Sequence, residues 1–289
     1  MSRLFGLLCE EPVNLSCKQV SKLPTGINVE DAAADIPPEA DGWGIGFYRN
    51  QGSFLFKKAS RNSRVQRITN ITEVVSSRVF ISHLRKATVG ERKEANTHPF
   101  RWGNWLFAHL GTISRFRKIR PRILRTLPPA YKKQIHGNTD SEHLFYLYLS
   151  MLRGEGGIKK GQIPLAAAVE GLKNFGRILE EFRRDAEIQE ISVLNFLISN
   201  GTYLLALRCE HPLYYVSYEE GTTEETRFFS PTTWLEYEIV QYSPSNKMVV
   251  VASEKLTASS NWREVPEKHI LAIESAQEIN ITPWLTDKV

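Results

Sequence analysis

The order of apolar runs along the chain most constrains its fold. Runs with strand character come first, two helical patterns follow, and strand-like runs return from Ile191 onward. This order favours an α+β layered sandwich over a regular βαβ alternation. The strands that we expect cover residues 3–9, 42–48, 52–58, 78–83, 105–109, 194–200, 203–209, 213–218, 239–242, 248–252 and 270–273.

Two segments between these strands carry helix signals. The sequence Thr139-Asp140-Ser141-Glu142 precedes an apolar-periodic stretch. It predicts a helix start in which Thr139 accepts a first-turn amide and Glu142 reaches back. Apolar residues on one helical face predict a second helix over 164–183. The polar stretches 22–40, 155–162 and 219–226 are predicted to be surface loops or insertions, so we expect a single domain over 1–289.

Composition excludes several classes of protein. With 42% hydrophobic and 24% charged residues, the 289-residue chain is typical of a globular protein with a sizeable core. No run approaches the roughly 20 apolar residues of a membrane span, and the first residues lack a signal-peptide pattern. We therefore expect a cytoplasmic protein without membrane contact. Three cysteines and no metal-ligand spacing predict neither a disulfide framework nor a metal or organic cofactor.

Basic residues concentrate in one segment. Eight of the 37 lysines and arginines lie between Arg115 and Lys133, where no acidic residue occurs. A solvated surface is the favoured interpretation, and an anion-binding or docking patch is the alternative. Nucleic-acid binding through this segment would require a steep salt dependence. With a net charge of only +5, no nucleic-acid partner is expected.

Short polar clusters follow several predicted strands, where a rigid sheet can present a site. Each cluster has a structural explanation when taken alone: a turn at Asp41-Gly42, core histidines at His83, His98 and His109, and a helix cap at Thr139. The clusters are 41–44, 83–90, 96–100, 108–112 and 138–142.

Taken together and in this order, the clusters resemble the class II (N-terminal nucleophile) glutamine amidotransferases, above all their small stand-alone members. The segments 251–256 and 262–266 also look like the closing strands of that family. The resemblance implies a four-layer α/β/β/α sandwich of two mostly antiparallel sheets. It also implies hydrolysis of glutamine or a γ-glutamyl amide, with any ammonia acceptor being a separate synthase.

The resemblance assigns substrate-binding roles to four residues. Arg85, in the His-x-Arg-x-Ala-Thr motif with Thr88 beside it, matches the arginine that grips the α-carboxylate of glutamine. A guanidinium offers a planar fork that suits a carboxylate. Asp140 matches the acid that accepts the α-ammonium, and His98, like Asp41, matches a position that shapes the pocket. Together these residues would bind the α-carboxylate and the α-ammonium of an amino acid.

Two positions at the reacting centre differ from the family pattern. The family nucleophile, a cysteine after the initiator methionine, is replaced by Ser2. The asparagine that donates to the oxyanion is replaced by Leu110, which leaves the backbone amide of Gly111 as the remaining donor. Three accounts stay open: a working serine nucleophile with its α-amine as base, a binding module without turnover, or a deliberate Cys→Ser exchange. Leu110 disfavours the third, because one exchange does not explain two departures.

Overall fold

The computed structural model describes residues 2–19, 40–50, 52–59, 71–152, 158–219, 227–230, 235–241, 243 and 245–285. Of the loops predicted for 22–40, 155–162 and 219–226, residues 22–39, 155–157 and 220–226 lie outside these residues. Within the described part of the chain, none of the helices has the length and apolar character that crossing a membrane requires.

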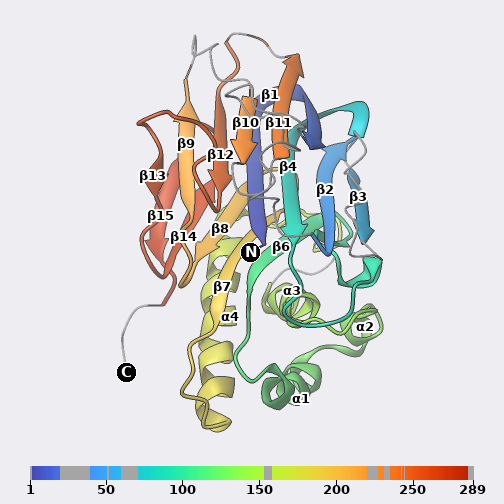
Figure 1. Cartoon of the computed structure of the whole chain (residues 1–289). Helices are drawn as coiled ribbons and strands as arrows, with labels where there is room; N and C mark the ends of the chain where they lie inside the picture. Colours follow the sequence, from blue (N-terminus) through green and yellow to red (C-terminus); the bar gives the residue numbers. More distant parts are fainter. Residues whose placement is uncertain are drawn as a thin grey trace, which may run out of the picture.

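Two antiparallel sheets form the centre of the fold (Figure 1). All recorded strand pairs are antiparallel. The nine-stranded sheet has the order β13-β9-β12-β1-β4-β2-β3 with the β10–β11 hairpin on β1, and the six-stranded sheet has the order β15-β14-β8-β7-β6-β5. The strands are β1 Arg3–Gln19, β2 Gly42–Arg49, β3 Gly52–Ala59, β4 Ile71–Arg85, β5 Phe100–Trp102, β6 Trp105–Thr112, β7 Val193–Ser199, β8 Leu204–Arg208, β9 Tyr214–Tyr218, β10 Arg227–Ser230, β11 Leu235–Gln241, β12 Met248–Ala252, β13 Arg263–Glu264, β14 His269–Ile273 and β15 Ile279–Pro283.

The apolar side chains of β1 alternate between two hydrophobic clusters, one on each face of the nine-stranded sheet. On β1, Leu4 and Leu8 belong to the cluster between the sheets, whereas Phe5 and Leu7 belong to the cluster on the outer face of the nine-stranded sheet. This is the period-two pattern of a strand buried on both faces. From Asn14 onward β1 pairs with β11, and the register of this pairing shifts between Asn14 and Leu15.

The β10–β11 hairpin covers part of that outer face. Tyr237 of β11 stacks on Phe5 with ring centroids 3.9 Å apart, and the fully buried Phe228 of β10 lies 6.2 Å from Phe5. The Tyr237 hydroxyl donates to Ser82 Oγ on β4 (3.0 Å). These contacts bury Phe5 near the start of β1.

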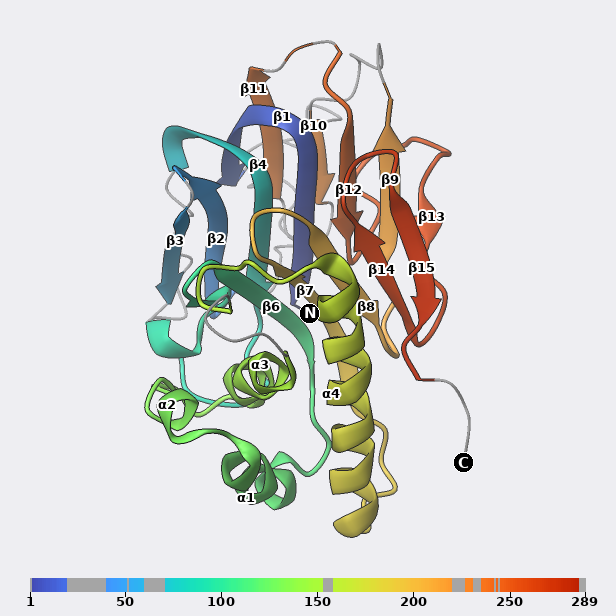
Figure 2. The same ribbon diagram turned by 180° about the vertical axis from the view of Figure 1, so that it is seen from behind.

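In the described part of the chain, four α-helices lie on the side of the six-stranded sheet (Figure 2). The two predicted helices are present as α3 and α4, and the α+β sandwich of two antiparallel sheets is confirmed. The described residues place no α-helix over the outer face of the nine-stranded sheet. The helices are α1 Phe116–Thr126, α2 Pro129–Lys132, α3 Asp140–Met151 and α4 Leu165–Asp185.

Helix α1 was not predicted, because the basic segment was interpreted only as a solvated surface or an anion-binding patch. Phe116, Ile119 and Ile123 form a buried stripe at helical spacing, and this stripe packs into the core beneath the six-stranded sheet. The exposed side holds the cations, so the predicted solvated surface is present, but it is helical. Burial of the stripe outweighs the hydrogen bond lost at Pro121.

Candidate active site

Four segments of the chain meet at one end of the sandwich. Ser2, ahead of β1, contacts the backbone of Lys86 at the end of β4. The loop after β4 reaches β6 through a hydrogen bond between the hydroxyls of Thr88 and Thr112 (2.7 Å). The segment after β6 reaches α3, because the Ile113 N–H donates to Asp140 Oδ2 (2.8 Å). The predicted residues Ser2, Arg85, Thr88, Gly111 and Asp140 are therefore neighbours.

The hydroxyl of Ser2 makes two hydrogen bonds to one residue. Its Oγ accepts the Lys86 N–H (2.9 Å) and donates to the Lys86 carbonyl (3.2 Å). The Arg3 guanidinium donates to the Ser2 carbonyl (3.0 Å) and pairs with Glu254 (3.2 Å). Ser2 is thus held directly beside Arg85, and its hydroxyl must leave Lys86 before it can attack a ligand.

The guanidinium of Arg85 organises the loop that follows it. It donates to the carbonyls of Val89 (2.8 Å), Glu91 (3.3 Å) and Gly90 (3.4 Å). Arg85 is only 3% exposed, and this burial lowers its pKa below the ordinary value, while the carboxylates of Asp41 and Asp140 oppose that lowering. Residues 89–91 therefore cover the guanidinium between two acidic side chains.

Asp140 begins α3 and is 2% exposed. Its Oδ1 accepts the Ser141 N–H (2.8 Å) and its Oδ2 accepts the Ile113 N–H. An anionic side chain is stabilised at this position by the unpaired amides and the dipole of the helix N-terminus. Each carboxylate oxygen retains acceptor capacity for a ligand ammonium.

The predicted helix start is half correct. Thr139 Oγ1 accepts the Glu142 N–H (3.3 Å), as expected. Glu142 does not reach back to Thr139, because its carboxylate accepts the N–H groups of His136 (3.0 Å) and Gly137 (2.6 Å). Glu142 therefore fixes the loop that leads into α3 instead of completing a capping box.

Gly111 and Leu110 face different sides of β6. Leu110 is 5% exposed and belongs, like Leu4, to the cluster between the sheets. Gly111 has a φ of +154°, and a Cβ there would lie 1.9 Å from the Val193 carbonyl oxygen. Only glycine fits this backbone position. The family pattern expects an asparagine side chain at position 110 as an oxyanion donor. Asn104 does not replace it, because Asn104 lies before the other end of β6 and donates to the Lys160 carbonyl (2.9 Å).

Three histidines lie buried beneath these residues. The rings of His83 and His98 are 4.2 Å apart, and none of their nitrogens has a hydrogen-bond partner among the described residues. His109 Nδ1 instead contacts Ser141 Oγ (2.9 Å). His98 also packs edge-on against Phe100 and is 4% exposed, so the structure places it in the interior.

Acid should destabilise the protein through His83 and His98. Burial, followed by His109 and Arg85, lowers the pKa of His83 to about 3. Burial lowers the pKa of His98 too, with His83, His109, Arg85 and Lys57 adding to the effect. Between the lowered pKa and the ordinary value near 6.5, the unfolded chain binds protons that the folded chain excludes. The free energy of unfolding therefore carries no penalty from these two histidines above about pH 6.5, and it decreases as the pH drops below that value.

Denaturant unfolding at about pH 7 and about pH 5 measures this effect. His83 should remove about 2 kcal/mol of unfolding free energy over this range, and His98 should add a further loss in the same direction. A variant with both histidines changed to Gln should lose less stability on acidification than the unchanged protein does. Equal losses in the two proteins would contradict the assignment.

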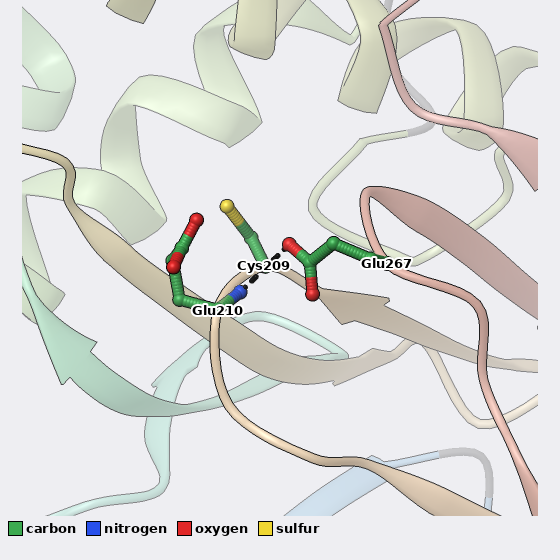
Figure 3. A group of neighbouring side chains, drawn as sticks. All are labelled: Cys209, Glu210 and Glu267. Carbon is green, nitrogen blue, oxygen red and sulfur yellow. Dashed lines mark hydrogen bonds between the residues drawn. The ribbon is translucent and has the colours of Figure 1, made fainter.

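One group of side chains outside the candidate active site has ligand types and spacing that could suit a metal ion (Figure 3). Cys209 Sγ and carboxylate oxygens of Glu210 and Glu267 lie within 4.8 Å of one another. Glu267, however, already accepts the Glu210 N–H (2.9 Å) and pairs with Arg208 (3.3 Å). Burial, with Glu267 and Glu210 adding to it, raises the pKa of the Cys209 thiol to about 12, which opposes formation of a metal-binding thiolate. We assign no metal to this group.

The basic segment forms the exposed side of α1 and α2. Arg115 pairs with Glu190 (2.5 Å), and Arg120 donates to His143 on α3 (3.1 Å). No ion pair is recorded for Arg117, Lys118, Arg125, Lys132 or Lys133, all of which the structure describes as exposed. The segment is thus a solvated cationic surface.

Several contacts at the candidate site were not foreseen from the sequence. Thr112 pairs with Thr88, and Asn96 is hydrogen-bonded to Asn138 (2.9 Å). Both asparagines lie within the polar clusters that the sequence analysis singled out. Spacing alone gave no indication that they meet, because 42 residues separate them.

The chain is similar in sequence to known proteins. A family model described as "Glutamine amidotransferases class-II" matches residues 1–285. The probable glutamine amidotransferase DUG3 of Saccharomyces cerevisiae is 28% identical over 270 residues, which are 87% of this chain and 74% of that protein. The gamma-glutamyl-hercynylcysteine sulfoxide hydrolase of Mycolicibacterium smegmatis is 24% identical over 252 residues, which are 84% of this chain and 82% of that protein.

A solved structure is similar over nearly the whole chain. The crystal structure of a predicted glutamine amidotransferase from Pseudomonas aeruginosa has a TM-score of 0.68 and 26% sequence identity, and the match covers 96% of this chain and 98% of that one. The sandwich, the converging polar segments and the family match lead to one conclusion: this chain belongs to the class-II glutamine amidotransferases.

Proposed function

We propose that the protein binds glutamine or a γ-glutamyl compound where Ser2, Arg85 and Asp140 converge, and hydrolyses its side-chain amide through an acyl ester on Ser2. The observation that carries the proposal is the pair of hydrogen bonds between Ser2 and Lys86, which holds the nucleophile next to Arg85. The hydrolase from M. smegmatis supports the γ-glutamyl alternative to free glutamine.

Arg85 and Asp140 would hold the two charges of the amino-acid end. The guanidinium binds the α-carboxylate and the Asp140 carboxylate accepts the α-ammonium. Both side chains are buried, and residues 89–91 accept hydrogen bonds from the guanidinium. These three bonds use only some of the five N–H donors of a guanidinium, so the remaining donors are left for the ligand carboxylate.

The reaction would proceed in two steps. After removal of Met1, the free α-amine takes the proton from Ser2 Oγ as Oγ attacks the amide carbon, and the Gly111 N–H donates to the oxyanion. The α-amine then protonates the leaving nitrogen, so ammonia or an amine departs and an ester remains. Water hydrolyses the ester to release the γ-carboxylic acid and regenerate Ser2. An ammonia acceptor would be a separate synthase.

A binding module without turnover is the second candidate. Ser2 and Leu110 favour it, because a hydroxyl is a weaker nucleophile than a thiol and one lost oxyanion donor costs about 10²–10³ in rate. Such a protein would sense a γ-glutamyl compound or support a partner enzyme with the same Arg85 and Asp140.

Mass spectrometry of the N-terminus together with an ammonia-release assay separates the two candidates. Hydrolysis requires that Ser2 be the first residue and that Ser2→Ala abolish release of ammonia from glutamine or of amine from a γ-glutamyl amide. Ser217→Ala is the matched control, because Ser217 Oγ also donates to a backbone carbonyl at 3.2 Å. Saturable binding without product would establish the binding module, and the absence of both binding and product would contradict the proposal.

A further inference from the structure

Two asparagines link the parts of the candidate site. Asn96, the last residue of a short 3₁₀ helix Glu94–Asn96, is 2% exposed. Its Nδ2 donates to Asn138 Oδ1 (2.9 Å) and to the Glu91 carbonyl (3.0 Å), and its Oδ1 accepts the Asn138 N–H (3.0 Å). A carboxamide is needed here, because Asp lacks the donor and Leu lacks both functions.

These bonds join the two charged groups of the site. The Glu91 carbonyl that accepts from Asn96 also accepts from the Arg85 guanidinium (3.3 Å). Asn138 stands two residues before Asp140 and directly before Thr139, which caps α3. An unbroken path therefore runs from Arg85 through Glu91, Asn96 and Asn138 to Asp140.

Two glycines permit this close approach. A Cβ on Gly137 would lie 2.3 Å from Asn96 Oδ1, and a Cβ on Gly90, whose φ is +79°, would lie 2.6 Å from Asn138 Oδ1. Any side chain at either position would separate the amides. The loop after β4 and the loop before α3 are thus built to meet at these two asparagines.

We propose that the Asn96–Asn138 pair is a positioning clamp that fixes the separation between Arg85 and Asp140. This inference rests on the proposed function, since it assumes a ligand that carries both charges. Neither asparagine need touch the ligand. A guanidinium and a carboxylate held at a fixed separation bind both ends of a zwitterion at once, whereas groups that move independently bind each end separately.

The test compares glutamine with analogues that carry only one of its two charges. Glutaramic acid lacks the α-ammonium and 4-aminobutanamide lacks the α-carboxylate. In Asn96→Ala the affinity for glutamine should fall about tenfold or more, whereas the affinities for the two analogues should change by less than about threefold. Asn138→Ala, which removes one of the three bonds, should have the same pattern with a smaller loss. Ligand-observed NMR measures the weak affinities.

Asn200→Ala is the matched control. Asn200 is also buried and also makes three hydrogen bonds, to Gly161, Thr202 and Tyr203, at the opposite end of β7. It should lower the melting temperature without changing the ratio of the three affinities. Equal losses for all three ligands in Asn96→Ala, or no loss for glutamine, would overturn the clamp alone. If the unchanged protein binds neither glutamine, nor either analogue, nor a γ-glutamyl amide, the proposed function is wrong, and the clamp proposal is wrong with it.

Discussion

Changing Ser2 to Cys and Leu110 to Asn together should raise glutaminase activity by at least about 10²-fold over the unchanged protein. The thiol is the stronger nucleophile at neutral pH, and the new carboxamide would add a donor to the oxyanion beside Gly111. Ammonia release from glutamine, measured on protein whose N-terminus has been verified, checks this expectation.

The single variants show which position limits the rate. Leu110 belongs to the apolar cluster between the sheets, so Leu110→Asn alone puts a polar group into that cluster and should lower the melting temperature. Ser2→Cys alone should raise activity less than the double variant does. A folded double variant with no more activity than the unchanged protein would show that the site has diverged beyond these two positions.

Arg85→Ala should abolish binding of glutamine or of a γ-glutamyl ligand. The ligand carboxylate would lose its cationic partner, and the carboxylates of Asp41, which keeps its ion pair with Arg92, and of Asp140 would oppose its binding. Such losses are typically about 3–5 kcal/mol, which is a drop in affinity of about 10² or more. Calorimetric titration with each ligand measures the change.

Two further variants separate ligand contact from loop support, because Arg85 also holds the carbonyls of residues 89–91. Asp140→Asn should weaken binding of glutamine while leaving the affinity for glutaramic acid, which has no ammonium, nearly unchanged. Arg78→Ala is the control, since Arg78 lies on the same strand and donates to the Cys9 carbonyl (3.1 Å). Unchanged affinity in Arg85→Ala would remove this residue from the site.

Much of the sandwich could be predicted from the sequence, because its signals are local. The hairpin of β2 and β3 follows from two short strand-like runs, and α4 follows from a regular apolar face. Helix α1 was missed because its apolar stripe has only three members within a basic segment interrupted by Pro121. Its stability depends on packing against α3, which no local pattern reveals.

The candidate site was predictable in its residue types but not in its connections. The order of motifs brought Ser2, Arg85 and Asp140 together through the family resemblance, and their ligand-binding roles stay predictions. The hydrogen bonds of Arg85 to its own loop, and of Asn96 to Asn138, join residues through backbone carbonyls and amides. Backbone groups are the same at every position, so sequence carries no trace of such partners.

A crystal structure of the protein soaked with glutamine or a γ-glutamyl amide tests the central claim most directly. The account predicts the α-carboxylate within hydrogen-bond distance of the Arg85 guanidinium, the α-ammonium on Asp140, and the side-chain carbonyl between Ser2 Oγ and the Gly111 N–H. A ligand bound elsewhere, or an empty site at saturating ligand, would contradict it.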